Sequence, residues 1–363
     1  MVYSYVIYFG VVLLSTFFAF LAQYFAKTND LKTTPNPFFY WISLLSLVLV
    51  MGLRSMSVGV DGTNYYYNYL KANSMDLFTY YQNHITEPGF YLLYKLSFLL
   101  GNHQWLFVIA AFITVLFFYK AICYQIDKIS FPLAIFIFAS TQYFYYFGIM
   151  RMGIAVAIIA YAYKYILEGN NKKYILWVIV ATTFHYSALF ALVVLFFNKN
   201  KNGFFKKENI LKIAVIIPLG FLAVRFIIFP FLTADRYAGY VESSGVFDIG
   251  FITTLPLLVI FSFFYNRLTI AHPHFQFYYF LFLAKVVTEL FSPIIGTGRM
   301  VWYLNFSICF LFPIILKINN DKKIKVLILI IAILYSAFYS YNAYFGDSWR
   351  GQNMFPYKLF YIT

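Results

Sequence analysis

Arg151 is the residue of this sequence that most needs a chemical explanation. It is the single charged residue between Phe131 and Tyr163, a stretch too long for one membrane span and long enough for two. A cation at membrane depth costs about 2.5–3.5 kcal/mol, so it normally faces a polar cavity, a partner or a ligand. We expect Arg151 at the turn between two spans, where it binds an anion or pairs with an acid distant in sequence.

Five other residues that could bind an anion or move a proton are expected at the same membrane face. They are Arg54, Asp61, Glu87, His185 and Arg299. Each also has a plainer interpretation. Arg54 and Arg299 end apolar runs and could extend to lipid headgroups. Glu87 could cap a helix, and His185 could be a neutral core histidine.

Two further features have both a structural and a functional interpretation. Lys285 and Glu289 stand four residues apart, so they can pair on one helix face inside the membrane. The segment 54–88 is rich in aromatic rings, which could stack on sugars or form the aromatic belt of the membrane interface. These rings are Tyr65, Tyr66, Tyr67, Tyr69, Phe78, Tyr80 and Tyr81.

The composition is that of a helical membrane protein, with 62% apolar, 24% aromatic and 11% charged residues. The net charge of +14 is scattered between apolar runs, which argues against nucleic-acid binding. Cys123 and Cys309 lack the spacing of a metal site, so no metal or redox cofactor is expected. The first apolar run extends from Val2 to Ala26, which is longer than the apolar region of a signal sequence, and no basic residue precedes Lys27, so the run is interpreted as a retained span.

The apolar runs predict an all-α polytopic membrane protein with about ten full spans, as a single transmembrane domain over residues 1–363. Two further segments, 89–100 and 174–197, are expected to be short or re-entrant helices. The predicted spans are 2–26, 37–53, 104–123, 131–149, 152–167, 209–232, 250–266, 275–295, 300–318 and 324–342.

The distribution of lysine and arginine predicts the orientation, because basic connections stay in the cytoplasm. The loops 54–88 and 233–249 are acidic or neutral and should be external. Both connections that flank 174–197 are basic, so this segment should enter the membrane and return, with His185 near the outer end. Irregular backbone at that depth is tolerated only inside protein or beside water. An outward cavity is therefore expected.

The order of the motifs resembles the EpsG-like, Wzy-type polysaccharide polymerases over most of the chain. Two departures are Met152 after Arg151, where the family tends to have glutamine, and Gly62 between Asp61 and Thr63. The matching motifs are Arg54 followed by Val58-Gly59-Val60-Asp61 and Tyr65, Glu87-Pro88-Gly89-Phe90, Arg151-Met152-Gly153-Ile154-Ala155, His185-Tyr186-Ser187-Ala188-Leu189, and Arg299 before Trp302 and Tyr303.

The resemblance implies a GT-C-like architecture and a multi-pass protein of the bacterial cytoplasmic (inner) membrane. Such a protein joins polyprenyl-diphosphate-linked oligosaccharide repeat units on the outer face and releases polyprenyl diphosphate. The product would be a capsule, an exopolysaccharide or an O-antigen. The resemblance implies no cofactor, metal or nucleotide, and its expected partners are the lipid-linked oligosaccharides, a flippase and a chain-length regulator.

The resemblance also gives the residues their expected roles. Arg151, Arg299 and Arg54 would bind the diphosphate leaving group, because arginine forks match phosphate oxygens. His185 would be the general base for the attacking hydroxyl, with Glu87 or Asp61 as the alternative. Arg54 and Asp61 could instead order the external loop over the sugars. An O-antigen ligase, a transporter or flippase of an anionic glycolipid, and more remotely an acyltransferase, stay open as alternatives.

Overall fold

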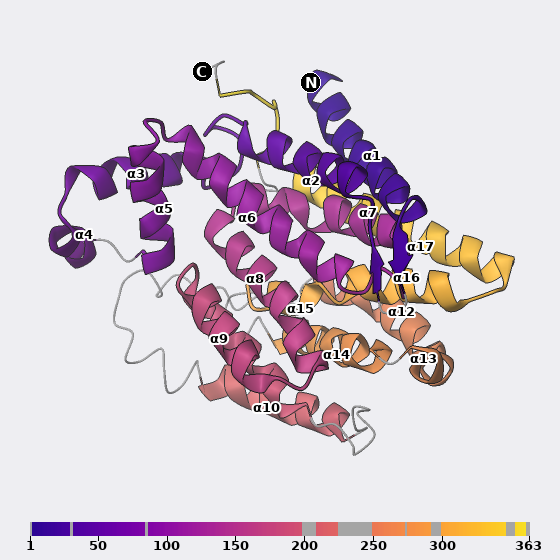
Figure 1. Cartoon of the computed structure of the whole chain (residues 1–363). Coiled ribbons are helices and arrows are strands. Elements are labelled where there is room, and N and C mark those ends of the chain that lie inside the picture. The colour runs from indigo at the N-terminus through magenta and orange to yellow at the C-terminus, as the bar shows by residue number, and fades with distance from the viewer. Residues whose placement is uncertain are drawn as a thin grey trace.

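The computed structural model describes residues 2–29, 32–83, 86–197, 208–223, 249–272, 274–291, 299–345 and 353–360. Helices form nearly all of the regular structure in this part of the chain (Figure 1). A short antiparallel pair of strands, β1 (Lys27–Asn29) and β2 (Lys32–Thr34), connects the first two helices. The predicted all-α class is confirmed.

Five described helical segments are long and apolar enough to cross a membrane. A sixth is added if α12 (Ile249–Phe263) and α13 (Tyr265–Ala271), which are bent by 59°, count as one span. The chain is a multi-pass membrane protein. The five segments are α1 (Val2–Tyr24), α6 (Gln104–Cys123), α8 (Met150–Leu167), α15 (Val301–Asn305) together with α16 (Ile308–Ile318), and α17 (Lys322–Phe345).

The predicted number of ten full spans is not confirmed, because several apolar runs form shorter or broken helices. A span usually needs about 20 residues. α2 (Pro37–Gly52) has 16 residues. α10 (Asn209–Ala223) and α14 (Phe275–Phe291) have 15 and 17, and the remainders of their predicted spans lie outside the described residues. The run 131–149 divides into α7 (Phe131–Thr141) and the 3-10 helix η1 (Tyr143–Phe147). Of the predicted external loop 233–249, residues 233–248 lie outside the described residues.

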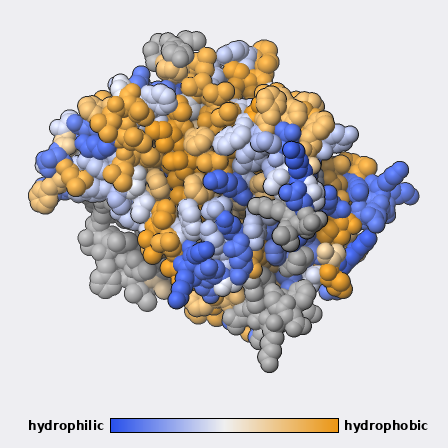
Figure 2. Space-filling view, in the orientation of Figure 1, coloured by the Kyte–Doolittle hydropathy of each residue, from blue (hydrophilic) through white to orange (hydrophobic). Residues whose placement is uncertain are grey.

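Apolar side chains cover much of the outer surface (Figure 2). Leu13, Leu211, Val259 and Leu334 are each more than 60% exposed. Soluble monomers rarely expose apolar patches of this extent, whereas lipid-facing helices do so by necessity. The surface therefore agrees with the membrane assignment.

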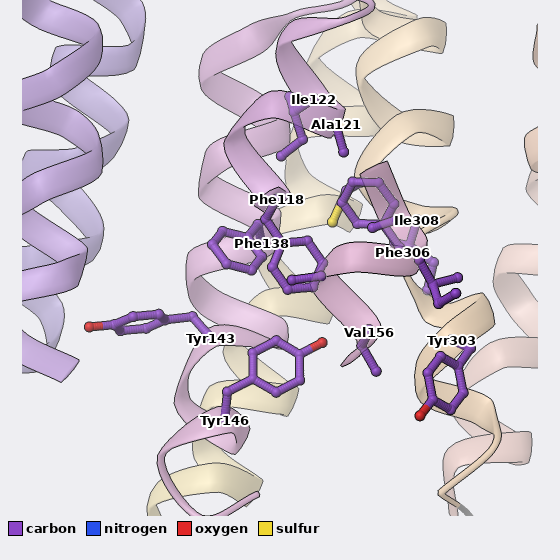
Figure 3. Close-up of a cluster of buried hydrophobic side chains, with 14 of the residues drawn as sticks. Phe118, Ala121, Ile122, Phe138, Tyr143, Tyr146, Val156, Tyr303, Phe306 and Ile308 are labelled. Carbon is purple, nitrogen blue, oxygen red and sulfur yellow. The ribbon is translucent and has the colours of Figure 1, made fainter. Parts of the chain in front are cut away.

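The interior where α6, α7, η1 and α16 meet is built from interlocking aromatic rings (Figure 3). The ring of Phe118 lies 4.4 Å from that of Phe138 and 5.2 Å from that of Phe306. Such aromatic pairs contribute about 0.5–1.5 kcal/mol beyond their burial. α8 packs closely here, because a Cβ added at Gly153 would meet the Tyr146 ring at 3.0 Å. This contact fixes the first turn of α8, which carries Arg151.

The predicted external segment 54–88 contains two helices, α3 (Gly62–Ser74) and α4 (Leu77–Asn83). With α5 (Pro88–Leu99) they lie at one end of the molecule, on the left of Figure 1. α5 packs between α3 and α6, and it has only 12 residues, as its short apolar run predicts.

The segment 174–197 forms a hairpin of α9 (Asn171–Thr182) and the 3-10 helix η2 (Tyr186–Phe196). The Tyr174 hydroxyl donates to the Ala191 carbonyl at 2.7 Å, so η2 runs back alongside α9. His185 lies in the turn between the two helices. The chain thus turns back on itself at His185, and the side of the membrane on which this turn lies stays a prediction.

Candidate functional site

A cavity of about 510 Å³ lies between α3, the first turn of α8, the tip of the α9–η2 hairpin and the residue two positions before α15. Four of the six predicted site residues, namely Asp61, Arg151, His185 and Arg299, share it although they span most of the sequence. The complete lining is Asp61, Asn64, Tyr65, Tyr67, Asn68, Lys71, Ile149, Arg151, Met152, His185 and Arg299.

Glu87, the fifth predicted residue, connects Arg151 to His185. Its Oε2 accepts a hydrogen bond from Arg151 Nη1 at 2.7 Å, and its Oε1 lies 3.6 Å from His185 Nδ1. The Glu87 side chain is 6% exposed and that of Arg151 21%, so this ion pair is less screened than a surface pair. Glu87 occupies the N-cap position of α5, yet in the described structure it makes no capping hydrogen bond. The carboxylate is instead the acidic partner of Arg151.

His185 continues the same chain of contacts toward α15. Its Nδ1 lies 3.3 Å from the Ser187 hydroxyl, which is 2.9 Å from the Tyr303 hydroxyl. Nδ1 also accepts the Ser187 backbone N–H at 3.4 Å, and the Glu87 carboxylate lies just beyond hydrogen-bond distance. The imidazole is therefore held between the start of η2 and the buried carboxylate, where a histidine can act as a base.

Gly89 brings Glu87 and His185 together. Its backbone N–H donates to the Thr183 carbonyl at 2.7 Å, which ties the start of α5 to the hairpin turn. A Cβ at this position would lie 2.6 Å from Thr183 Oγ1 and 2.9 Å from the Thr183 carbonyl oxygen. Only glycine permits this approach, which explains the glycine two residues after Glu87.

The cavity is cationic. Three of its lining residues, Lys71, Arg151 and Arg299, are positive, and Asp61 is the one carboxylate among the lining residues. Burial raises the pKa of Tyr65, although the adjacent Arg151 charge and backbone N–H oppose this shift. Tyr65 therefore keeps its hydroxyl proton at neutral pH. The arrangement suits an anionic ligand with polar groups around it.

Arg54 does not line this cavity, although it was predicted with the other residues. It is fully buried, and its guanidinium donates to the carbonyls of Val58 at 3.0 Å, Met51 at 2.6 Å and Phe147. It also lies between the rings of Phe107 and Phe147, 4.9 and 4.8 Å from their centres. Neither the predicted diphosphate contact nor the headgroup anchor fits this burial. Arg54 holds the loop that leads to Asp61, which was the alternative prediction.

The comparison with known families decides the identity. The sequence profile of the EpsG family matches residues 38–359, which include all six predicted site residues. The chain belongs to the EpsG family. This family comprises Wzy-type polysaccharide polymerase-like proteins. No match was found among curated proteins or among solved structures.

The sequence analysis of this EpsG-family chain missed one wall of the cavity. Asn64, Asn68 and Lys71 follow Asp61 at intervals of three and four residues, so they share one face of α3. The low apolar content of this helix, together with that spacing, was the signal that could have identified the face. The sequence analysis predicted a role for the aromatic residues of this segment instead. Of these, Tyr65 and Tyr67 line the cavity.

The buried pair Lys285 and Glu289 is separate from the lining of the cavity in the EpsG-family chain. Lys285 Nζ donates to Glu289 Oε1 at 2.6 Å and to Thr254 Oγ1 at 2.8 Å, which joins α14 to α12. Both side chains are less than 5% exposed. Among the described residues, no cluster of three or more histidine, cysteine or acidic side chains is arranged to hold a metal ion.

Proposed function

We propose that this EpsG-family protein joins polyprenyl-diphosphate-linked oligosaccharide repeat units on the outer face of the bacterial cytoplasmic membrane. The observation that carries the proposal is the cationic cavity with a histidine at its wall and a buried carboxylate, Glu87, beside that histidine. A polysaccharide polymerase of this kind must stabilise a leaving diphosphate and deprotonate a sugar hydroxyl. Both tasks have suitable residues in the one cavity.

Arg151 and Arg299 bind the diphosphate of the donor in this proposal. The contact with Glu87 uses one of the five N–H donors of the Arg151 guanidinium, so others can reach phosphate oxygens. Negative charge grows on the diphosphate as the glycosidic bond breaks. Removing one contact of this kind typically lowers the rate by about 10²–10³.

His185 is the proposed general base. The acceptor hydroxyl oxygen forms a bond to the anomeric carbon of the donor, and its proton moves to the imidazole of His185. The bond between that carbon and the diphosphate oxygen breaks, and its electron pair leaves with polyprenyl diphosphate. Glu87 stabilises the imidazolium that forms, so it is a positioning residue. The proposed reaction needs neither a metal ion nor a nucleotide.

The α3 face binds the acceptor sugars in this proposal. Asn64 and Asn68 offer amide groups that donate and accept hydrogen bonds, which sugar hydroxyls require. Tyr67 offers a ring for stacking. Asp61, at the start of the same helix, is the alternative base or a further hydroxyl ligand.

The test is to supply the purified protein with short polyprenyl-diphosphate repeat units and to separate the products by size. A ladder with release of polyprenyl diphosphate supports polymerisation. Lipid that changes leaflet without elongation contradicts it and favours a flippase. Single transfer to a different glycolipid acceptor, without a ladder, favours a ligase. His185→Ala should abolish the ladder, whereas His103→Ala, a matched histidine outside the cavity lining, should retain it.

A flippase and a chain-length regulator are the further partners expected of such a polymerase. A flippase must deliver the repeat units to the outer face before they can react. Adding either partner to the purified protein should change the supply or the length of the chains and leave the bond-forming step unaltered.

A further inference from the structure

A second cavity begins beside the polar one and is lined almost entirely by apolar side chains. It has a volume of about 370 Å³, within the range of small-molecule sites, and lies between η2 and α10. Tyr186 and Met300 line it, and these residues directly follow His185 and Arg299 of the polar cavity. The polar and apolar cavities are therefore neighbours at two points of the chain.

The geometry of η2 gives this apolar groove a straight wall. A 3-10 helix has three residues per turn, so every third side chain falls on one line, and runs of this length are uncommon. The line Ala188, Ala191 and Val194 is buried on the protein side. The other two lines face the groove. One consists of Tyr186, Leu189 and Leu192, and the other of Ser187, Phe190, Val193 and Phe196.

α10 forms the opposite wall. The rings of Phe190 and Phe221, one from each helix, lie 6.2 Å apart, and both line the groove. Gly220 also lines the groove, and a Cβ added there would have no described atom within 4 Å. The missing side chain leaves room for a ligand.

We propose that this groove binds the first isoprene units of the polyprenyl tail of the donor, next to the diphosphate on Arg151 and Arg299. This inference rests on the proposed function. A polyprenyl diphosphate joins an anionic group directly to one long apolar chain, so it needs a cationic site and an apolar site side by side. A single straight groove suits one linear chain better than the paired acyl chains of a phospholipid.

The kinetic test uses Gly220→Trp, which fills the groove and removes no polar group. The KM for a donor with a full-length tail should rise at least about tenfold, equivalent to the loss of about two buried methylene groups. The KM for a donor whose diphosphate carries a methyl group in place of the polyprenyl tail should change less, and kcat should be retained. Gly10→Trp is the matched control, because Gly10 also has open space around it and lies on α1.

An equal rise in KM for the methyl-capped and the full-length donors, or no rise for either, would overturn the proposal. Gly220→Ala, which adds one carbon into open space, should keep the parental KM. If it raised the KM as strongly as Gly220→Trp, the effect would come from the helix and not from the groove, and the proposal would be rejected.

A binding test separates this inference from the polymerase proposal. A sugar-free polyprenyl diphosphate with a diazirine in its tail should label peptides that contain residues 186–196 and 216–221. Unlabelled polyprenyl diphosphate should compete, and phosphatidylglycerol should not. Labelling without any polymer ladder would reject the polymerase function and keep the groove. Equal competition by phosphatidylglycerol, or no labelling of these peptides, would reject the groove.

Discussion

Gly89→Ala tests whether the contact between α5 and the hairpin turn is what assembles the site. The new Cβ would lie 2.6 Å from Thr183 Oγ1 and 2.9 Å from the Thr183 carbonyl oxygen. An ordinary contact begins near 3.4 Å, so the start of α5 must withdraw from the turn by about 0.8 Å. Glu87, two residues earlier, moves with it and away from His185 Nδ1.

The magnitude follows from this displacement. A misplacement of about 1 Å in an active site can lower the rate by about 10²-fold. We therefore expect Gly89→Ala to lower kcat by nearly that factor while the protein stays folded. Adding Thr183→Ala removes the closest atom and leaves the carbonyl, so the required shift falls to about 0.5 Å and the loss to about tenfold.

The assay is the ladder formed by purified protein, with thermal unfolding of the same samples in detergent. Gly10→Ala is the matched control, since its Cβ would have no described atom within 4 Å. Full turnover of Gly89→Ala would refute the reasoning, because the positions of Glu87 and His185 would then not matter. A double variant no better than the single one would show that the Thr183 hydroxyl is not the obstacle.

Three further predictions concern single side chains. Arg151→Lys keeps the charge but loses the fork, so turnover should fall by about 10²–10³, whereas Arg267→Lys, at an exposed arginine outside the cavity lining, should be silent. Arg54→Lys leaves buried carbonyl groups without a donor, which costs about 1–3 kcal/mol for each carbonyl. The melting temperature should therefore drop, while turnover per folded molecule is retained. Lost turnover at an unchanged melting temperature would instead indicate that Arg54 binds a ligand. Tyr65→Phe should lower turnover without altering the pH profile of turnover between 7 and 10, because burial raises the pKa of Tyr65 and keeps its hydroxyl neutral there. A parental profile that falls at alkaline pH, with this fall absent in the variant, would count against this prediction.

The grouping of the site residues could be predicted because their sequence positions follow a simple rule. Asp61, Glu87, Arg151, His185 and Arg299 each lie at or near the start of a helical element or in a turn, where a charged side chain can leave the apolar layer. Charge asymmetry then places these ends at one face. The bounds of a helix such as α6 (104–123) could be predicted equally well, because the length of the apolar run alone determines them.

The partners of these residues could not be predicted, because they depend on packing. Glu87 and Arg151 are 64 residues apart, and nothing in either motif identifies the other. The burial of Arg54 depends on three carbonyls that converge only in the folded chain. Apolar periodicity also cannot distinguish a 3-10 helix from an α-helix over a short run, so the form of η2 was not foreseen.

The walls of the polar cavity come from segments that begin at Asp61 and end at Arg299. A ribosome must therefore synthesise more than 200 residues after the first wall before the last one exists. Under the proposed function, the nascent chain can insert its early helices beside lipid-linked substrates without acting on them. Bond formation starts only when the late helices have docked, so premature termination gives an inert protein and no unregulated polymer.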